Sequence, residues 1–230
     1  MVSSGCVSLI YRSASIYELA MRALYGRHHR ERLRAVAEQV PAGATVLELC
    51  CGTGSLYLRH LRARVGSYVG LDANPGFVAG LQARGVDARL IDLVDPDQVL
   101  PRADVAIMQA SLYHFLPDAD AIVQRMLGAA ERCVIISEPV RNLSSSTLPL
   151  IGTIGRRATD PGVGGHADRF TETTLDQLMA AYDVRAAFLT PGGRDKVYVL
   201  GASGSRDSAA ISSGVSAHRS SGPLASRSIR

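Results

Sequence analysis

The sequence lacks long hydrophobic runs. None of its 230 residues lies in an uninterrupted apolar stretch approaching the roughly 18 residues that a membrane-spanning helix requires. The N-terminus also lacks the charged region followed by an apolar region that marks a secretory signal. Hydrophobic residues make up 47% and charged residues 20% of the chain, proportions typical of a globular protein with a substantial core. We therefore expect a cytoplasmic protein with no membrane span and one domain of ordinary size.

Cysteine is scarce, and its spacing does not match the common metal motifs. Two of the four cysteines, Cys50 and Cys51, are adjacent, and no second pair stands at ligand spacing. Adjacent cysteines suit reduced thiols better than a disulfide framework. We expect no metal site, and we expect Cys50 and Cys51 to be small buried side chains.

The sequence also lacks a basic stripe. The net charge is +4, but residues 203–230 hold four arginines and one aspartate, which leaves 21 basic and 20 acidic residues in the rest of the chain. A body this close to neutral argues against a nucleic-acid partner. Because residues 203–230 are rich in Ser, Arg and Ala without periodicity, we expect them to form a disordered tail.

Apolar segments recur at regular intervals, each followed by a stretch with helical periodicity. This alternation is typical of an open parallel sheet covered on both faces. The predicted strands are 45–50, 67–72, 86–92, 104–110 and 133–137, and the predicted helices are 55–65, 75–84, 117–131 and 171–182. Two further strands, 184–189 and 196–200, are joined by a turn so short that they must be antiparallel. The sequence therefore predicts an α/β fold whose sheet closes with a C-terminal hairpin.

Residues 46–54, VLELCCGTG, form the most informative motif. An apolar strand carrying Glu48 is followed by Gly52 and Gly54, which let the backbone pass close to a ligand. A dinucleotide-binding turn needs a third glycine where this chain has Tyr57. An ordinary strand-to-helix turn is the alternative interpretation of the two glycines.

This segment resembles motif I of the class I S-adenosylmethionine-dependent methyltransferases, written (D/E)-x-G-x-G-x-G. Glu48, Gly52 and Gly54 match the motif, and Cys50 replaces its first glycine. The resemblance covers about residues 20–202. It implies a Rossmann-like, doubly wound, seven-stranded sheet, mostly parallel with an antiparallel C-terminal hairpin, and S-adenosylmethionine as cofactor. Acids at strand ends suit this ligand, which carries a sulfonium cation and no phosphate.

The resemblance assigns cofactor contacts to residues at the ends of successive strands. Asp72, 24 residues after Glu48, would bind the ribose hydroxyls, Asp92 would meet the adenine amine, and Gln109 would lie near the methionine end. From the residues alone, Asp72 is also a candidate helix cap, although Asn74 is the more natural one, and Asp92 a solvated turn residue. The predicted cofactor-binding residues are Glu48, Cys50, Gly52, Gly54, Asp72, Ala73, Asp92, Leu93, Gln109 and Tyr25.

Catalytic and acceptor-binding residues are predicted beyond the fourth and fifth strands. His114 is a candidate general base, with a packed core histidine as the alternative, and Glu138 is a second acid/base candidate. The connection 138–170 spans 33 residues, and we interpret it as a substrate lid, with a surface loop carrying solvated arginines as the alternative. The predicted acceptor-binding residues are Tyr113, His166 and Arg169. Within 138–170, the apolar run 148–154 indicates an acceptor with hydrophobic bulk, and the arginines Arg156, Arg157 and Arg169 suit an acidic group on it.

These features predict methyl transfer from S-adenosylmethionine to a small molecule by in-line displacement, yielding S-adenosylhomocysteine. The expected organisation is an N-terminal helical lid (1–40), a methyltransferase domain (41–202) and the tail, in a monomer or homodimer. A small-molecule acceptor is favoured because no second domain or basic face would recognise a macromolecule. Two alternatives stay open: a non-catalytic module that binds S-adenosylmethionine or a partner, and an NAD-dependent oxidoreductase, which Tyr57 and a missing Tyr-x-x-x-Lys pair disfavour.

Overall fold

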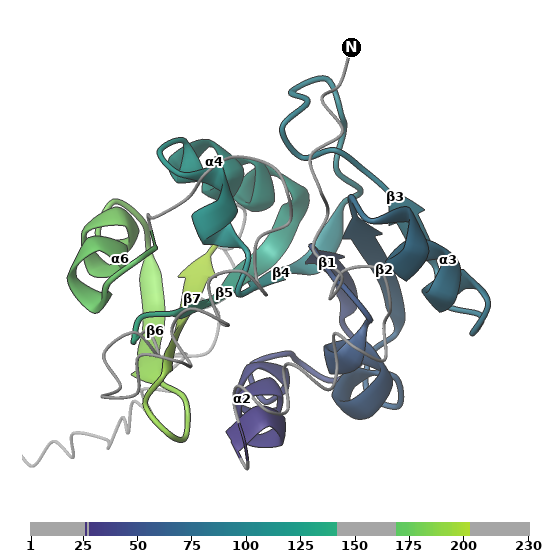
Figure 1. Cartoon of the computed structure of the whole chain (residues 1–230), viewed down its shortest axis with the longest axis horizontal. Coiled ribbons are helices and arrows are strands. Elements are labelled where there is room, and N and C mark those ends of the chain that lie inside the picture. The colour runs from purple at the N-terminus through teal and green to yellow at the C-terminus, as the bar shows by residue number, and fades with distance from the viewer. Residues whose placement is uncertain (1–25, 27, 142–168, 203–230) are drawn as a thin grey trace, which may run out of the picture.

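The computed structural model describes residues 26, 28–141 and 169–202. A seven-stranded sheet crosses this part of the chain in the order β3-β2-β1-β4-β5-β7-β6 (Figure 1). The strands are β1 (Thr45–Leu49), β2 (Ser67–Asp72), β3 (Ala88–Leu90), β4 (Ala103–Gln109), β5 (Ala130–Pro139), β6 (Val184–Leu189) and β7 (Asp195–Gly201). The pairs from β3 to β5 are parallel, and β7 is antiparallel to both β5 and β6. The predicted Rossmann-like fold with its closing hairpin is confirmed.

Helices cover both faces of the sheet. They are α2 (His28–Ala37), the π-helical turn η2 (Tyr57–Leu61), α3 (Pro75–Gln82), the 3₁₀ turn η3 (Leu112–Phe115), α4 (Ala119–Ala129) and α6 (Glu172–Met179). The helices α4 and α6 pack on one face, and α2, η2 and α3 pack on the other (Figure 1). Within β1, Leu47 and Leu49 face α4 while Val46 faces α2, which is the alternation expected of a strand buried on both sides.

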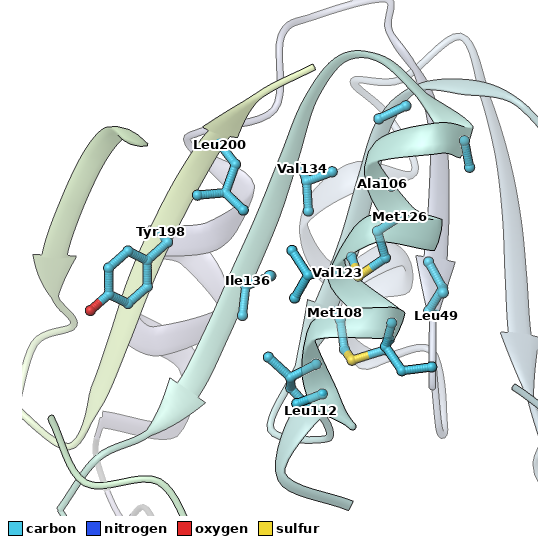
Figure 2. Close-up of a cluster of buried hydrophobic side chains, with 14 of the residues drawn as sticks. Leu49, Ala106, Met108, Leu112, Val123, Met126, Val134, Ile136, Tyr198 and Leu200 are labelled. Atoms are coloured by element: carbon cyan, nitrogen blue, oxygen red, sulfur yellow. The ribbon is translucent and has the colours of Figure 1, made fainter. Parts of the chain in front are cut away.

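The helix α4 illustrates how the core fixes the strands that carry the site. Val123 and Met126 of α4 lie in one cluster with Leu49, Met108 and Ile136, from β1, β4 and β5 (Figure 2). All five side chains are fully buried. Packing of this density resists displacement, so the carboxyl ends of these three strands keep a fixed relative position.

Local sequence signals set several helix boundaries. Asn74 caps α3, because its side-chain oxygen accepts hydrogen bonds from the amides of Gly76 (2.9 Å) and Phe77 (3.2 Å). Pro75 occupies the first turn of α3, where its missing N–H costs nothing. Thr171 and Thr174 form a capping box at the start of α6. The cap predicted at Asn74 is confirmed.

Most elements differ from the prediction by a few residues at their ends, and three of the differences have a clear structural cause. The strand expected over 86–92 is only Ala88–Leu90, since β3 lies at the edge of the sheet with one neighbour. The strand expected over 133–137 extends to Ala130–Pro139, because β5 pairs on both sides. The helix expected over 55–65 contains the π turn η2, in which the Arg62 amide bonds the Tyr57 carbonyl (2.9 Å).

Several predicted features lie outside the described residues. These are Tyr25 and His166, nearly all of the lid segment 138–170, the N-terminal part of 1–40 and the tail 203–230. Every helix within the described ranges is too short or too polar to cross a lipid bilayer.

Candidate cofactor and acceptor site

The turn after β1 adopts the backbone conformation that its glycines predict. Gly52 (φ 56°) and Gly54 (φ 67°) have positive φ, and so does Cys50 (φ 53°), which stands where the motif has its first glycine. A Cβ on Gly52 would meet no atom within 4 Å, so this position faces open space. A Cβ on Gly54 would lie 2.5 Å from Leu81 of α3. Gly54 therefore has a packing role, and Gly52 is the position that leaves room beside the turn.

Asp72, the last residue of β2, ties this turn to the neighbouring strand. Its Oδ2 accepts a hydrogen bond from the Gly52 amide (2.7 Å), and its Oδ1 accepts one from the Asn74 amide (2.8 Å). Burial raises the pKa of this carboxyl above its ordinary value, while the two amide bonds oppose that shift. The carboxylate thus lies where β1 and β2 end, with Ala73 exposed beside it.

Glu48 is buried between β2 and β4 on the face that α2 covers. The Tyr68 hydroxyl donates to its Oε2 (2.7 Å), and the Gln109 amide donates to its Oε1 (3.3 Å). Gly70 leaves space for this arrangement, since a Cβ there would lie 2.9 Å from the Tyr68 hydroxyl. The ring of Tyr57 stacks on Tyr68 with centroids 3.9 Å apart. Burial raises the pKa of Glu48 to about 7.

Unsatisfied polar atoms lie at the ends of β4 and β5. Gln109 and Ser137 are register partners in these strands, so their side chains share the face with Glu48. Within the described chain, Gln109 Oε1 and Ser137 Oγ are buried without a hydrogen-bond partner. Because buried polar atoms in native proteins are nearly always bonded, these two oxygens are candidates to contact a ligand.

The residues predicted to contact adenine occupy a turn after β3. Asp92 is exposed, and its Oδ1 accepts a hydrogen bond from the Val94 amide (3.0 Å). Leu93 is buried in the core cluster on the α4 face, and its carbonyl accepts a hydrogen bond from Arg125. The adenine contacts of both residues stay predictions.

The segment after β4 brings three predicted acceptor-site residues together. Tyr113 is buried, and the guanidinium carbon of Arg169 lies 4.1 Å from the centroid of its ring. The rings of Tyr113 and His114 have centroids 4.0 Å apart. The segment starts at Ala110, whose φ of 50° is unusual for a residue with a Cβ. A cation, a phenol and an imidazole therefore meet near the carboxyl edge of the sheet.

Sequence reasoning missed the groups that support these residues. Tyr68 donates a hydrogen bond to Glu48. It lies two residues before Gly70, the register partner of Glu48, and therefore on the same face of the sheet. This spacing could have identified Tyr68 from the sequence. The buried ion pair of Arg32 with Asp195 (2.5 Å) joins α2 to β7 across 163 residues, and no local sequence pattern predicts it. Among the described side chains, no group of three or more His, Cys, Asp and Glu is arranged to hold a metal ion.

Residues 21–186 match the model of a family described as a methyltransferase domain. The chain belongs to this family. The match confirms the resemblance to class I S-adenosylmethionine-dependent methyltransferases that the glycine turn predicted. No curated protein matches the chain.

Solved structures of methyltransferases share the fold of this methyltransferase domain. The magnesium protoporphyrin IX methyltransferase of Synechocystis PCC 6803 with bound S-adenosylhomocysteine is 18% identical, with a TM-score of 0.58 over 81% of this chain and 94% of that chain. A Haloferax volcanii methyltransferase in complex with the activator Trm112 is 14% identical, with a TM-score of 0.63 over 85% and 98%. The DhpI complex with S-adenosylhomocysteine is 19% identical, with a TM-score of 0.61 over 83% and 92%.

Proposed function

We propose that this methyltransferase domain transfers a methyl group from S-adenosylmethionine to a small-molecule acceptor and releases S-adenosylhomocysteine, as a cytoplasmic monomer or homodimer. The observation that carries the proposal is the turn from Cys50 to Gly54, which has three residues at positive φ. Its Gly52 amide bonds Asp72, and the turn lies beside Glu48 and Gln109. It lies at the carboxyl edge of the parallel strands, where ligands bind in this class of sheet.

The described residues fit the cofactor chemically. The open side of Gly52 offers space, and the buried Gln109 Oε1 offers an unpaired acceptor. A sulfonium cation beside the carboxyl groups of Asp72 and Glu48 would favour their ionised forms, and the resulting negative charge would complement the cation. The proposed cofactor-binding residues are Glu48, Cys50, Gly52, Gly54, Asp72, Ala73, Asp92, Leu93 and Gln109, with Tyr25 beyond the described part of the chain.

When bound, S-adenosylmethionine supplies an electrophilic methyl group on a good leaving group. The main task of the protein is then to position the acceptor, which can contribute effective molarities of about 10⁵–10⁸ M. His114 would take a proton from an acceptor that must lose one. Tyr113 offers an aromatic surface, and Arg169 offers a positive charge next to it. This pairing supports an acceptor with hydrophobic bulk and an acidic group.

The test is methyl transfer from labelled S-adenosylmethionine to a panel of small aromatic carboxylic acids, each paired with its neutral ester. We expect labelled product and S-adenosylhomocysteine with a subset of the acids, and weaker turnover of the matching esters, which cannot pair with Arg169. Equal turnover of acids and esters would contradict the assignment of Arg169 but not the activity.

A second candidate is a module that binds S-adenosylmethionine or a protein partner without turnover. The Haloferax volcanii neighbour is in complex with an activator, which favours the protein-partner part of this candidate. Binding of S-adenosylhomocysteine with no product across the panel would support this candidate. Thermal stabilisation by NAD but not by S-adenosylhomocysteine would contradict both.

A further inference from the structure

Glu138 lies near the end of β5, and its carboxylate is hydrogen-bonded to the segment that contains Tyr113 and His114. The side chain has 0% exposure. Its Oε1 accepts hydrogen bonds from two consecutive amides, those of Ser111 (2.7 Å) and Leu112 (2.8 Å). The Ser111 hydroxyl does not cap η3, because it donates instead to the Gln109 carbonyl (3.0 Å). The cap of this turn is therefore supplied by a neighbouring strand.

The backbone just before these amides is strained. Ala110 has a φ of 50°, a conformation that persists only where the surroundings enforce it. Two contacts with β5 do so: the Ala110 amide bonds the Ser137 carbonyl (2.7 Å), and Glu138 holds the next two amides. The path of the chain out of β4 thus depends on the carboxylate of Glu138.

The second oxygen of Glu138 is not satisfied. Its Oε2 is buried without a hydrogen-bond partner in the described part of the chain. Cys50 after β1, Tyr113 of η3 and Asp195 of β7 are the titratable groups that interact electrostatically with this carboxyl. Asp195 pairs with Arg32 of α2 on the other face of the sheet. The charged group on the same face is Lys196, the register partner of Glu138 in β7, and its ammonium pairs with Glu172 (3.0 Å) and Asp176 (2.7 Å) of α6.

This environment makes the charge of Glu138 variable near neutrality. Burial raises its pKa to about 7, and the charge of Asp195 adds to that shift. The backbone amides of Leu112, Ser111 and, more weakly, Tyr113 oppose it. An ionised carboxylate is a much stronger acceptor for two amides than a protonated one. Protonation at Oε2 therefore weakens both bonds at Oε1.

We propose that Glu138 is a positioning residue whose ionised carboxylate fastens the Ser111 and Leu112 amides, and that its protonation loosens the segment presenting Tyr113 and His114. Glu138 acts through the backbone rather than by touching the acceptor. Its effect on turnover rests on the proposed function, whereas the fastening of the two amides is measurable without any acceptor.

The test is amide hydrogen exchange by NMR, expressed as protection factors from about pH 5.5 to 8.5. In the wild-type chain the protection of the Ser111 and Leu112 amides should fall roughly tenfold as the pH is lowered, since a charge-assisted bond becomes a neutral one. Glu138→Gln keeps an acceptor of the same shape that does not titrate, so its two amides should show pH-independent protection. The Ala110 amide, bonded to a backbone carbonyl, is the internal reference.

Glu48→Gln is the matched control, because Glu48 is the other buried glutamate with a pKa raised to about 7 but contacts Tyr68 and Gln109 instead. This variant should keep the wild-type pH dependence at Ser111 and Leu112. In parallel, the ¹³C shift of the Glu138 carboxyl in the wild-type chain should titrate together with the two protection factors, which needs no substitution.

Two results would overturn the proposal. One is that the protection factors of the Ser111 and Leu112 amides in the wild-type chain do not change with pH. The other is that Glu138→Gln keeps the wild-type pH dependence of these protection factors. With an acceptor from the panel, Glu138→Gln should flatten the acidic limb of kcat/KM for the acceptor and leave the affinity for S-adenosylhomocysteine within about twofold. Failure of S-adenosylhomocysteine to bind the wild-type chain contradicts the proposed function alone, because the exchange result is independent of it.

Discussion

At the scale of single residues, two glutamates are buried on opposite faces of one sheet. Glu48 faces α2 and is held by Tyr68 and Gln109, while Glu138 faces η3. Burial raises the pKa of each from an ordinary 4.5 to about 7. Such a group favours the protonated form in the fold. Its ionisation cost is absent below about pH 4.5 and complete above about pH 7, so its contribution lowers stability as the pH rises through that window.

Glu48→Gln should remove one of these costs. Relative to the wild-type chain, its free energy of unfolding should rise by on the order of 2 kcal/mol between about pH 5 and about pH 8, because glutamine does not ionise. Urea denaturation across this range measures the difference. Glu131→Gln is the control, since Glu131 is more than half exposed and pairs with Arg102 on the surface (3.3 Å). Parallel pH curves for the wild type and Glu48→Gln would contradict the account.

Cys50 and Glu48 show which properties of a single residue can be predicted from the sequence. The motif predicted a turn that needs positive φ, and Cys50 adopts it at 53° despite its side chain. Glu48 was predicted as a cofactor contact from the same motif, yet its burial and its bond to Tyr68 depend on β2, 20 residues further on. Local residue spacing predicts backbone conformation well, but it does not predict which residue will pair with a buried charge.

At the scale of elements, α2 is attached to the hairpin that closes the sheet. Arg32 and Asp195 form an ion pair with side chains 5% and 0% exposed. A pair so deeply buried costs desolvation, and losing one partner leaves an uncompensated charge. The link therefore joins the first described helix to β7, the strand that lies antiparallel beside β5.

Arg32→Ala should lower the free energy of unfolding by about 3–5 kcal/mol, because Asp195 would stay buried without its cation. Arg34→Ala on the same helix is the control. Arg34 pairs with Glu38 at 2.7 Å, but both side chains are exposed (73% and 52%), so we expect a change below about 0.5 kcal/mol. Chemical denaturation measures the free energy of unfolding of both variants. Equal decreases in the two variants would show that the ion pair does not anchor α2.

Element types were more predictable than element lengths. Short apolar segments placed β1, β2 and β4 within one residue of their ends, since that pattern is local. The length of β3 depends on its having a single neighbour, and that of β5 on its having two. The π turn η2 places Tyr57 against Tyr68, a contact that periodicity does not encode.

At the scale of the whole molecule, the topology gathers distant segments at one edge of the sheet. The carboxyl ends of β1, β2 and β4 bring the turn at Cys50 next to Asp72 and Gln109. The segment after β4 then brings Tyr113 to Arg169, 56 positions later in the chain. The fold, the family and the location of the candidate site at this edge could be predicted from the order of strands and glycines in the sequence. The acceptor could not, because His166 and most of the predicted lid lie outside the described residues.

The central claim is that this edge binds S-adenosylmethionine, and calorimetric titration with S-adenosylhomocysteine tests it most directly. Asp72→Ala should weaken binding roughly tenfold, since it removes the carboxylate and the anchor of the Gly52 amide. Asp104→Ala should stay within about twofold of the wild type, because Asp104 bonds the Thr45 amide (2.7 Å) at the opposite edge of the sheet. A wild-type chain that does not bind S-adenosylhomocysteine, or an Asp72→Ala variant that binds it equally well, would contradict the claim.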